Sequence, residues 1–292
     1  MALDIQTNLA SLQAQQNVAK NTTALQASYQ KLSSGLRVNS SSDDAAGLAI
    51  SENMKAQIRS YTVAQRNAAD GTSMSQTAEG ALGQIHDILG RMRELAMQGS
   101  NGTLGSTDQT NLNNEFRSLQ DEVGRIQDST QFNGIKLIAS TSGGAQDPAS
   151  VQLQVGLGGN VGATGSDTIA VNFNGMDLSG LIGAYATGAT TGGATLLTET
   201  DAQAALSTID TAIQTVSTNR AAFGAATNRL NYASNTIQTM SSNLTAANGR
   251  IVDVDVASET AVMSRNQVLS QAGISVLAQA NQLPQMAFSL LK

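Results

Sequence analysis

The sequence predicts a mainly α-helical protein: an elongated rod of long antiparallel helices, with a small β-hairpin region and a terminal two-helix coiled coil. Three observations predict this class. Apolar residues recur every three or four positions over long stretches, which is the pattern of helices that pack lengthwise. Only 3% of the 292 residues are aromatic and 13% are charged, so small residues must form much of the packing. One periodic stretch is also too long for a compact globule.

The first forty residues are predicted to form an amphipathic helix. Its apolar residues step by threes and fours: Ile5, Leu9 and Leu12, then Leu25, Tyr29, Leu32 and Leu36. Gly35 and the polar run 39–42 interrupt this pattern. Asp43 or Asp44 is therefore expected to cap the start of a second helix, and capping is the preferred interpretation over a catalytic pair of acids.

The second helix is expected to continue to about Gln98. A helix of about 55 residues is roughly 80 Å long, whereas a compact globule of this chain length has a radius of gyration of about 19 Å. The molecule must therefore be a rod, or this helix must be kinked near Gly71 or Gly80.

A turn at 99–105 precedes a third helix, whose apolar face is Leu112, Phe116, Leu119, Val123 and Ile126. The period then changes. Asn133-Gly134 lies between short apolar runs and predicts a hairpin turn. Residues 151–155 and 168–173 alternate like strands, and the glycine-rich run 156–160 between them is interpreted as a turn because it lacks the lysine of a phosphate-binding loop. Residues 183–199 show little pattern and are expected to form a surface loop.

Helical periodicity returns at Asp201 for over forty residues and is expected to stop at Asn248-Gly249. The last segment has no charged residue between Asn266 and Leu291. An apolar side is nevertheless marked by Val268, Leu269, Val276, Leu283 and Phe288. Because a free surface helix normally carries charges, we expect this segment to pack against other protein: the two termini pair with each other and with copies from neighbouring subunits. The alternative is a purely internal core.

Composition excludes several function classes. The net charge is −6 and no Lys/Arg cluster is present, so a nucleic-acid groove is not expected. There is no cysteine and a single histidine, His86, so no His-rich zinc site can be built and His86 is interpreted as a rim residue. The sequence has no window of about 18 consecutive apolar residues, so no membrane span is predicted. The N-terminus lacks the pattern of a cleaved signal peptide. No catalytic, metal or cofactor site is predicted, and the protein is not expected to be an enzyme.

Several runs resemble bacterial flagellin. At the N-terminal end these are residues 1–8 (MALDIQTN), 32–39 (LSSGLRVN), 43–50 (DDAAGLAI), 91–96 (RMRELA) and 130–134 (TQFNG). At the other end, 271–282 (QAGISVLAQANQ) and the final Leu290-Leu291-Lys292 match in the same way. The resemblance covers roughly residues 1–140 and 200–292.

The resemblance implies a domain organisation. Residues 1–43 and 255–292 would form an inner coiled-coil domain. Residues 44–182 and 200–254 would form a rod domain with its β region near 131–175, and 183–199 a short variable surface loop. Little room remains for the outer domains that many flagellins insert, so the chain is expected to be a short form without large outer domains.

The resemblance also implies function and partners. The protein would be an extracellular structural subunit that assembles into the flagellar filament, the propeller for swimming motility, after export unfolded through the flagellar channel. Burial of the apolar residues of the two terminal helices would drive assembly at the tip. Implied partners are further copies of the chain, the flagellar junction and cap proteins, an export chaperone at the C-terminal helix, and the host flagellin-sensing Toll-like receptor.

The resemblance further implies two sets of site residues within the rod. Arg91, Leu95 and Glu115 match the receptor-recognition positions of the family; contacts within the rod are the alternative role. Phe132, Asn133 and Gly134 mark the hairpin region expected to switch the supercoil.

Other functions remain open at this stage. A hook–filament junction protein would share the coiled-coil ends and the rod. A secreted effector or adhesin of helical-hairpin architecture would need a developed central domain, which is short here. An enzyme would need a nucleophile–base set, an acid pair or a metal cluster, and the sequence contains none.

Overall fold

The computed structural model describes residues 8–138, 150–158, 167–173, 178, 181 and 193–290, with side chains described as far as residue 282. The chain divides into two compact units, residues 1–58 with 242–292, and residues 59–241. We call them the terminal unit and the central unit, and describe each by itself. The helices are α1 (Leu9–Ser34), α2 (Ala45–Gly99), α3 (Ser106–Ser129), α5 (Glu199–Val252) and α6 (Val256–Leu290).

The predicted fold class is confirmed: the described residues are mainly helical, with long antiparallel helix pairs and two small sheets. α2 is assigned as one helix through both Gly71 and Gly80. One expected helix end is wrong. α5 does not stop at Asn248-Gly249 but continues to Val252, because a glycine inside a long packed helix costs only about 1 kcal/mol relative to alanine.

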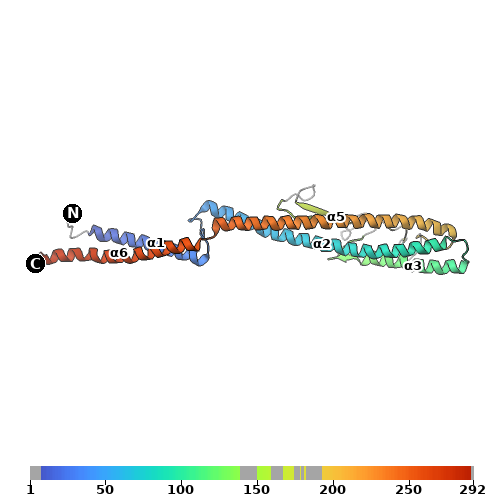
Figure 1. The fold of residues 1–292 in the computed structure, drawn as a ribbon, viewed down its shortest axis with the longest axis horizontal. Coiled ribbons are helices and arrows are strands. Elements are labelled where there is room, and N and C mark those ends of the chain that lie inside the picture. The colour runs from blue at the N-terminus through green and yellow to red at the C-terminus, as the bar shows by residue number, and fades with distance from the viewer. Residues whose placement is uncertain are drawn as a thin grey trace. The chain divides into compact units, whose positions relative to one another are not determined.

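In the terminal unit, α1 and α6 run antiparallel and lie side by side (Figure 1). Asn8 caps α1 by accepting a hydrogen bond from Ser11 N, and Gly35 ends it in the left-handed region, with φ of 72°. The chain then pairs with the start of the return segment through an antiparallel bridge between Leu36 and Asp253. The first and last helices of the described chain are thus paired with each other.

The start of α2 is fixed by its two predicted acids. Asp44 Oδ1 accepts a hydrogen bond of 2.8 Å from Gly47 N, which is the geometry of a helix N-cap. Asp43 Oδ2 instead accepts from the backbone N–H groups of Asn39 and Ser40, at 3.1 and 2.9 Å. Capping by Asp44 is therefore confirmed, and Asp43 organises the loop before it.

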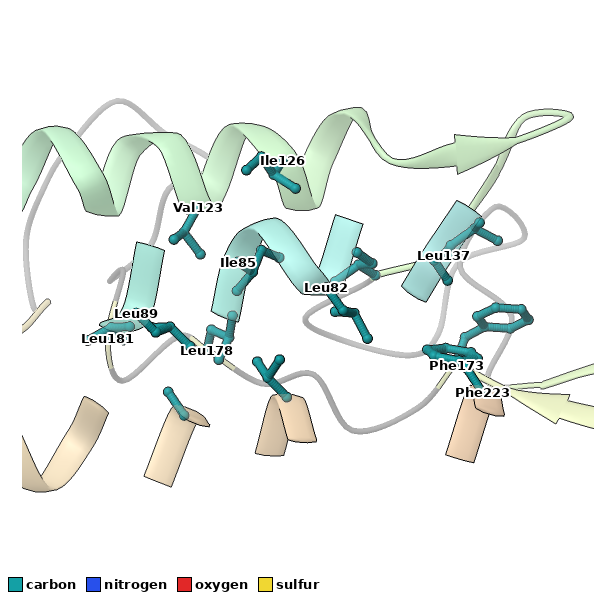
Figure 2. Packing of buried hydrophobic residues seen from close by; sticks show 14 of the residues in the cluster. Leu82, Ile85, Leu89, Val123, Ile126, Leu137, Phe173, Leu178, Leu181 and Phe223 are labelled. Atoms are coloured by element: carbon teal, nitrogen blue, oxygen red, sulfur yellow. The ribbon is translucent and has the colours of Figure 1, made fainter. Parts of the chain in front are cut away.

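The core of the central unit lies between α2, α3 and α5. Its largest fully buried side chains include Leu82, Ile85, Leu89 and Met92 of α2 and Phe116 of α3. Figure 2 shows Leu82, Ile85 and Leu89 beneath Val123 and Ile126 of α3, with Phe173 and Phe223 packed against each other at one end. Pairs of contacts fix the antiparallel register of α2 and α5: Gln65 with Gln238 at 3.2 Å, and Arg93 with Asp210 at 2.7 Å.

Two antiparallel hairpins complete the central unit. β1 (Gln131–Phe132) pairs with β2 (Ile135–Lys136), and β3 (Ser150–Gln154) pairs with β4 (Thr168–Asn172). In the first turn Asn133 and Gly134 both have positive φ, 50° and 79°, as the Asn-Gly pair predicts. Leu153 of β3 packs on α2 where Gly71 leaves room, because a Cβ at residue 71 would lie 2.1 Å from Leu153 Cδ1.

Of the expected surface loop, 183–199, residues 183–192 lie outside the described residues. On either side of it the chain is held by two amides of α3. Gln120 Nε2 donates to the carbonyl oxygens of Leu181 and Ala194, at 2.6 and 2.9 Å. Asn113 Oδ1 accepts from Leu196 N at 3.0 Å, and the Leu196 side chain is fully buried.

Candidate assembly surface

The contact between α1 and α6 is formed by small and polar side chains. The buried and half-buried positions of α1 step by threes and fours: Ser11, Ala14, Val18, Asn21, Leu25, Ser28 and Leu32. Positions of α6 with the same spacing are Met263, Asn266, Ser270, Gly273, Leu277 and Ala280. This is the 3–4 repeat of a coiled coil, but few of its members carry a large apolar side chain. The seam therefore permits close approach while burying little apolar surface.

Specific contacts confirm the close approach. Asn8 Nδ2 donates to Ala280 O at 2.9 Å, and Ser11 Oγ donates to Asn281 Oδ1 at 2.8 Å. Further along, Gly273 lies close to Val18, since a Cβ at residue 273 would be 2.8 Å from Val18 Cγ2. The pair is held by backbone proximity and polar contacts as much as by apolar burial.

Several large apolar side chains of the same two helices are exposed, whereas Leu25, Leu32 and Leu277 lie in the seam. On α1, Leu9 is 70% exposed, and Leu12 and Tyr29 are each 51% exposed. On α6 the exposed fractions are 63% for Val268, 46% for Leu269, 55% for Ile274 and 56% for Val276. We call these seven residues the terminal apolar surface. Fully burying one such side chain is worth about 1.5–3 kcal/mol, so the isolated helix pair leaves considerable stabilisation unused.

The predicted assembly residues fall into three groups. Leu9, Leu12, Tyr29, Val268, Leu269 and Val276 are exposed, as above; Leu25, Leu32 and Leu36 are half-buried. Ile5 lies outside the described residues, as do the side chains of Leu283 and Phe288. Sequence reasoning did not list Ile274 as an assembly residue. The sequence analysis also missed the inward seam, because serine, alanine and glycine do not stand out in a pattern of large apolar residues. Their spacing of three and four residues could have indicated the seam.

The connections at the inner end of the helix pair are fixed by backbone hydrogen bonds. Arg37 N donates to Val252 O at 2.6 Å and Val254 N donates to Gly35 O at 3.0 Å. The guanidinium of Arg37 also donates to Ile251 O at 2.5 Å. These bonds tie the α1–α2 link to the α5–α6 link, so the register of the pair is set where the chain enters it.

In the central unit the structure brings Arg91 and Glu115 together and separates Leu95 from them. The Arg91 guanidinium lies 2.8 Å from Glu115 Oε1 and 2.9 Å from Glu94 Oε2, all at the surface. The pKa of Arg91 is raised above its ordinary value, mainly because Glu115 accepts hydrogen bonds from the guanidinium and secondly because Glu94 does. Leu95 is 1% exposed and belongs to the core.

The other residues singled out in the sequence are the hairpin residues and His86. Phe132 is half-buried against the central core, whereas Asn133 and Gly134 are exposed. His86 is half-buried, and its Nδ1 has no hydrogen-bond partner among the described residues. Among the described residues no group of His, Asp and Glu side chains could hold a metal ion. None of the described helices is apolar enough over a sufficient length to cross a membrane.

Comparison with known proteins gives consistent matches. Residues 5–142 match the family model of the bacterial flagellin N-terminal helical region, and residues 206–291 match that of the C-terminal helical region. A flagellin from Halalkalibacterium halodurans is 44% identical over 98% of both chains. A flagellin from Bacillus subtilis is 40% identical, again over 98% of both chains.

One solved structure shows the same fold at low sequence identity. It is described as a flagellar hook-associated protein from Vibrio parahaemolyticus, with a TM-score of 0.56, 17% identity, and coverage of 72% of this chain and 100% of that one. This likeness concerns the fold alone. The full-length matches to relatives at 40% identity or more identify the family.

Proposed function

This chain belongs to the bacterial flagellin family, the structural subunits of the extracellular flagellar filament, and from that premise we propose how it assembles. It is not an enzyme. Assembly is driven by burial of the terminal apolar surface between neighbouring copies, after the chain has been exported unfolded and reaches the filament tip. Residues 1–43 and 255–292, within the terminal unit, form the inner coiled-coil domain, and residues 44–182 and 200–254 form the rod domain.

The observation that supports this proposal is the inverted polarity of the α1–α6 pair. Small and polar residues predominate in the inward seam, which Leu25, Leu32 and Leu277 also join, while the seven residues of the terminal apolar surface remain exposed. When a monomer exposes many large apolar side chains on one helix pair, those side chains mark a surface that a partner covers in the assembly. Because the stretch from Asn266 to Leu291 has no charge, covering it requires no charged side chain to leave water.

Contacts between copies that do not close into a ring generate an open filament. The terminal apolar surface supports such contacts because its members are spread over both helices of the pair. Leu9 and Leu12 are on α1 near one end, whereas Val268, Leu269 and Val276 are on α6. Each copy can therefore contact more than one neighbour through this surface. An unpaired terminal pair has little apolar burial of its own, so it gains its full stability on assembly.

Other partners follow from the same surface and from the rod. The exposed C-terminal helix is the part of the chain that an export chaperone would cover before assembly, and junction and cap proteins would meet the filament at its two ends. The exposed Arg91–Glu115 pair is the part of the predicted receptor site that a host Toll-like receptor can reach. The Asn133-Gly134 turn, with two positive φ angles, is the proposed element of the supercoil switch.

Seeded polymerisation tests the assembly proposal. Purified chain is added to short sheared filament seeds, and elongation is followed by light scattering and electron microscopy. The variant Val268→Ser/Val276→Ser is expected to raise the critical concentration at least tenfold. As matched control, Ser264→Ala changes an exposed polar residue of the same helix and should elongate normally. If the double variant elongates like the unchanged chain, the terminal apolar surface is not what drives assembly.

A further inference from the structure

The sequence contains four Asn-Gly pairs, and the described ones fold into three different surroundings. In such a pair the backbone nitrogen of the glycine can attack the asparagine side chain, because glycine has no Cβ to obstruct the approach. Asn101-Gly102 lies in the turn between α2 and α3, Asn133-Gly134 in the β1–β2 hairpin, and Asn248-Gly249 inside α5. Asn174-Gly175 lies outside the described residues.

Two of these pairs are held in regular structure. Gly249 is inside α5, and its carbonyl oxygen accepts a helical hydrogen bond from Asp253 N at 2.8 Å. At the hairpin, Phe132 and Ile135 pair directly on either side of Asn133-Gly134. Attack on the asparagine side chain requires the peptide between the two residues to rotate. In both places that rotation is opposed by the hydrogen bonds of the helix or of the paired strands.

The Asn101-Gly102 pair is restrained less. Both residues are exposed, and the Gly102 N–H donates to none of the described residues. The hydrogen bonds that close this turn are long: Leu104 N lies 3.3 Å from Asn101 O, and Thr103 N lies 3.4 Å from Asn101 Oδ1. Both exceed the usual range of about 2.7–3.2 Å. The second bond also folds the Asn101 side chain over the Gly102 peptide, which is the direction of the attack.

A carboxylate stands beside the same glycine. Glu199 is the first residue of α5, and its Oε2 lies 3.4 Å from the position that a Cβ of Gly102 would occupy. The carboxylate is therefore within reach of the Gly102 amide, directly or through one water molecule. Gln203 Nε2 donates to the other oxygen, Glu199 Oε1, at 3.3 Å. Oε2 itself has no partner among the described residues, so it is available to accept a proton.

We propose that Asn101 is a self-modification site, which deamidates without an enzyme and faster than Asn133 or Asn248. The Gly102 nitrogen forms a bond to Asn101 Cγ and gives its proton to the Glu199 carboxylate. The Cγ–Nδ2 bond breaks, and the amino group leaves as ammonia with that proton. The product is a five-membered imide, which water opens to aspartate or isoaspartate at position 101. Water is the only co-reactant.

The product changes the local structure of this end of the central unit. Opening of the imide adds a negative charge close to Glu199, and the isoaspartate form lengthens the backbone by one methylene group. The end of α2 packs closely on α5 here, since a Cβ at Gly99 would lie 3.4 Å from Ala202 Cβ. No lysine or arginine occurs in residues 97–112 or 193–206 to neutralise the new charge. Because like charges repel, the turn is expected to loosen from the start of α5 as the chain ages.

Incubation in water enriched in oxygen-18 tests the site, because each deamidation incorporates one oxygen atom from water. Trypsin releases the three described pairs in separate peptides, which are 94–117, 126–136 and 230–250. Mass spectrometry of the folded, full-length chain is expected to show Asn101 gaining the label about tenfold faster than Asn133 or Asn248. In guanidinium chloride, where the chain is unfolded, the three rates are expected to converge.

Two variants separate the parts of the reaction. Gly102→Ala places a methyl group in the path of the attack and is expected to slow labelling of Asn101 at least about tenfold. Glu199→Gln keeps the shape of the side chain but accepts a proton poorly, so it is expected to slow labelling at least about threefold. Asp201→Asn is the matched control, because Asp201 is an acid of the same helix end that does not lie within 4 Å of a Cβ at Gly102. Circular dichroism melting of each chain identifies variants that fail to fold.

Equal labelling of the three sites in the folded chain overturns the proposal. So does the same ratio of rates in guanidinium chloride, because the preference for Asn101 would then not come from the fold. An unchanged rate in Glu199→Gln removes this carboxylate as the proton acceptor. Hydrogen–deuterium exchange of the aged chain is expected to be faster in peptides from 97–112 and 193–206, and unchanged exchange there would contradict the loosening of the turn. None of these readouts depends on filament elongation.

Discussion

Gly273 of α6 lies so close to Val18 of α1 that a Cβ atom at residue 273 would be 2.8 Å from Val18 Cγ2. At this contact the small-residue seam of the terminal pair has no room for a larger side chain. A valine side chain offers little freedom to move aside, because its χ1 is restricted in a helix. The glycine therefore sets how near the two helices can be.

Gly273→Val is expected to destabilise the terminal pair by about 1–3 kcal/mol through overpacking, although valine favours helix more than glycine does. Hydrogen–deuterium exchange in peptides from 8–36 and 253–282 measures this as faster exchange. Adding Val18→Ala should restore protection by opening the space. Gly80→Val is the control, since nothing lies within 4 Å of a Cβ at that position. Unchanged exchange in Gly273→Val would show that the helices are not closely packed at this point.

The pKa of Asp43 is predicted to be below its ordinary value of 3.8, because the N–H groups of Asn39 and Ser40 and the Ser40 hydroxyl donate to its carboxylate. For a lowered pKa, the contribution to stability is complete above the ordinary value and is lost as pH falls through the folded value. The 39–44 loop should thus be insensitive to pH above about 4 and loosen in stronger acid. Carbon-13 NMR titration of the carboxyl group checks this, and a pKa at or above 3.8 would contradict it.

Asp43→Asn provides the matched control for this titration. The amide oxygen can still accept one of the backbone N–H bonds, but it has no charge to lose. Exchange of the Ser40 amide is therefore expected to become independent of pH between about 2 and 5 after correction for intrinsic rates, whereas in the unchanged chain it accelerates toward the acid end.

Arg91→Ala is expected to lower activation of cells bearing the flagellin-sensing receptor at least thirtyfold, the size of effect found when an interface hot-spot arginine is removed. Its ion pairs are exposed, so the melting temperature of the central unit should change little. Arg93→Ala is the matched control, because Arg93 forms an exposed ion pair with Asp210 at 2.7 Å and is not among the matched receptor positions. Equal signalling by the two variants would remove Arg91 from the receptor site.

Gly134→Ala is expected to change filament waveform. Residue 134 has φ of 79°, a conformation that costs an alanine about 1–2 kcal/mol, so the variant should favour whichever packing relaxes this turn. Dark-field microscopy of assembled filaments measures pitch and handedness. Gly80→Ala adds the same methyl group at an open helical position and should leave the waveform unchanged. If Gly134→Ala filaments have the same waveform as Gly80→Ala filaments and the unchanged chain, the hairpin is not part of the supercoil switch.

The sequence by itself determined the helical architecture and its turns. Three-and-four spacing over long stretches predicts helices wherever they occur, and α2 and α5 are found as such. Asn133-Gly134 and Asp44 specify a hairpin turn and a helix cap through local chemistry, and both are found in place. These features could be predicted from the sequence because each depends only on residues a few positions away along the chain. The same local reasoning failed at Asn248-Gly249, where packing carries α5 through a glycine.

Only the tertiary structure decided which face of each terminal helix is inside. Periodicity shows that Leu9 and Leu12 share a face but not that this face is exposed, nor that Ser11 and Ala14 form the seam. It likewise placed Leu95 in the core and Arg91 beside Glu115. The physical reason is that burial depends on the partner surface: Gly273 allows α1 to approach so closely that small residues fill the contact. The seven residues of the terminal apolar surface are thereby left outside the pair.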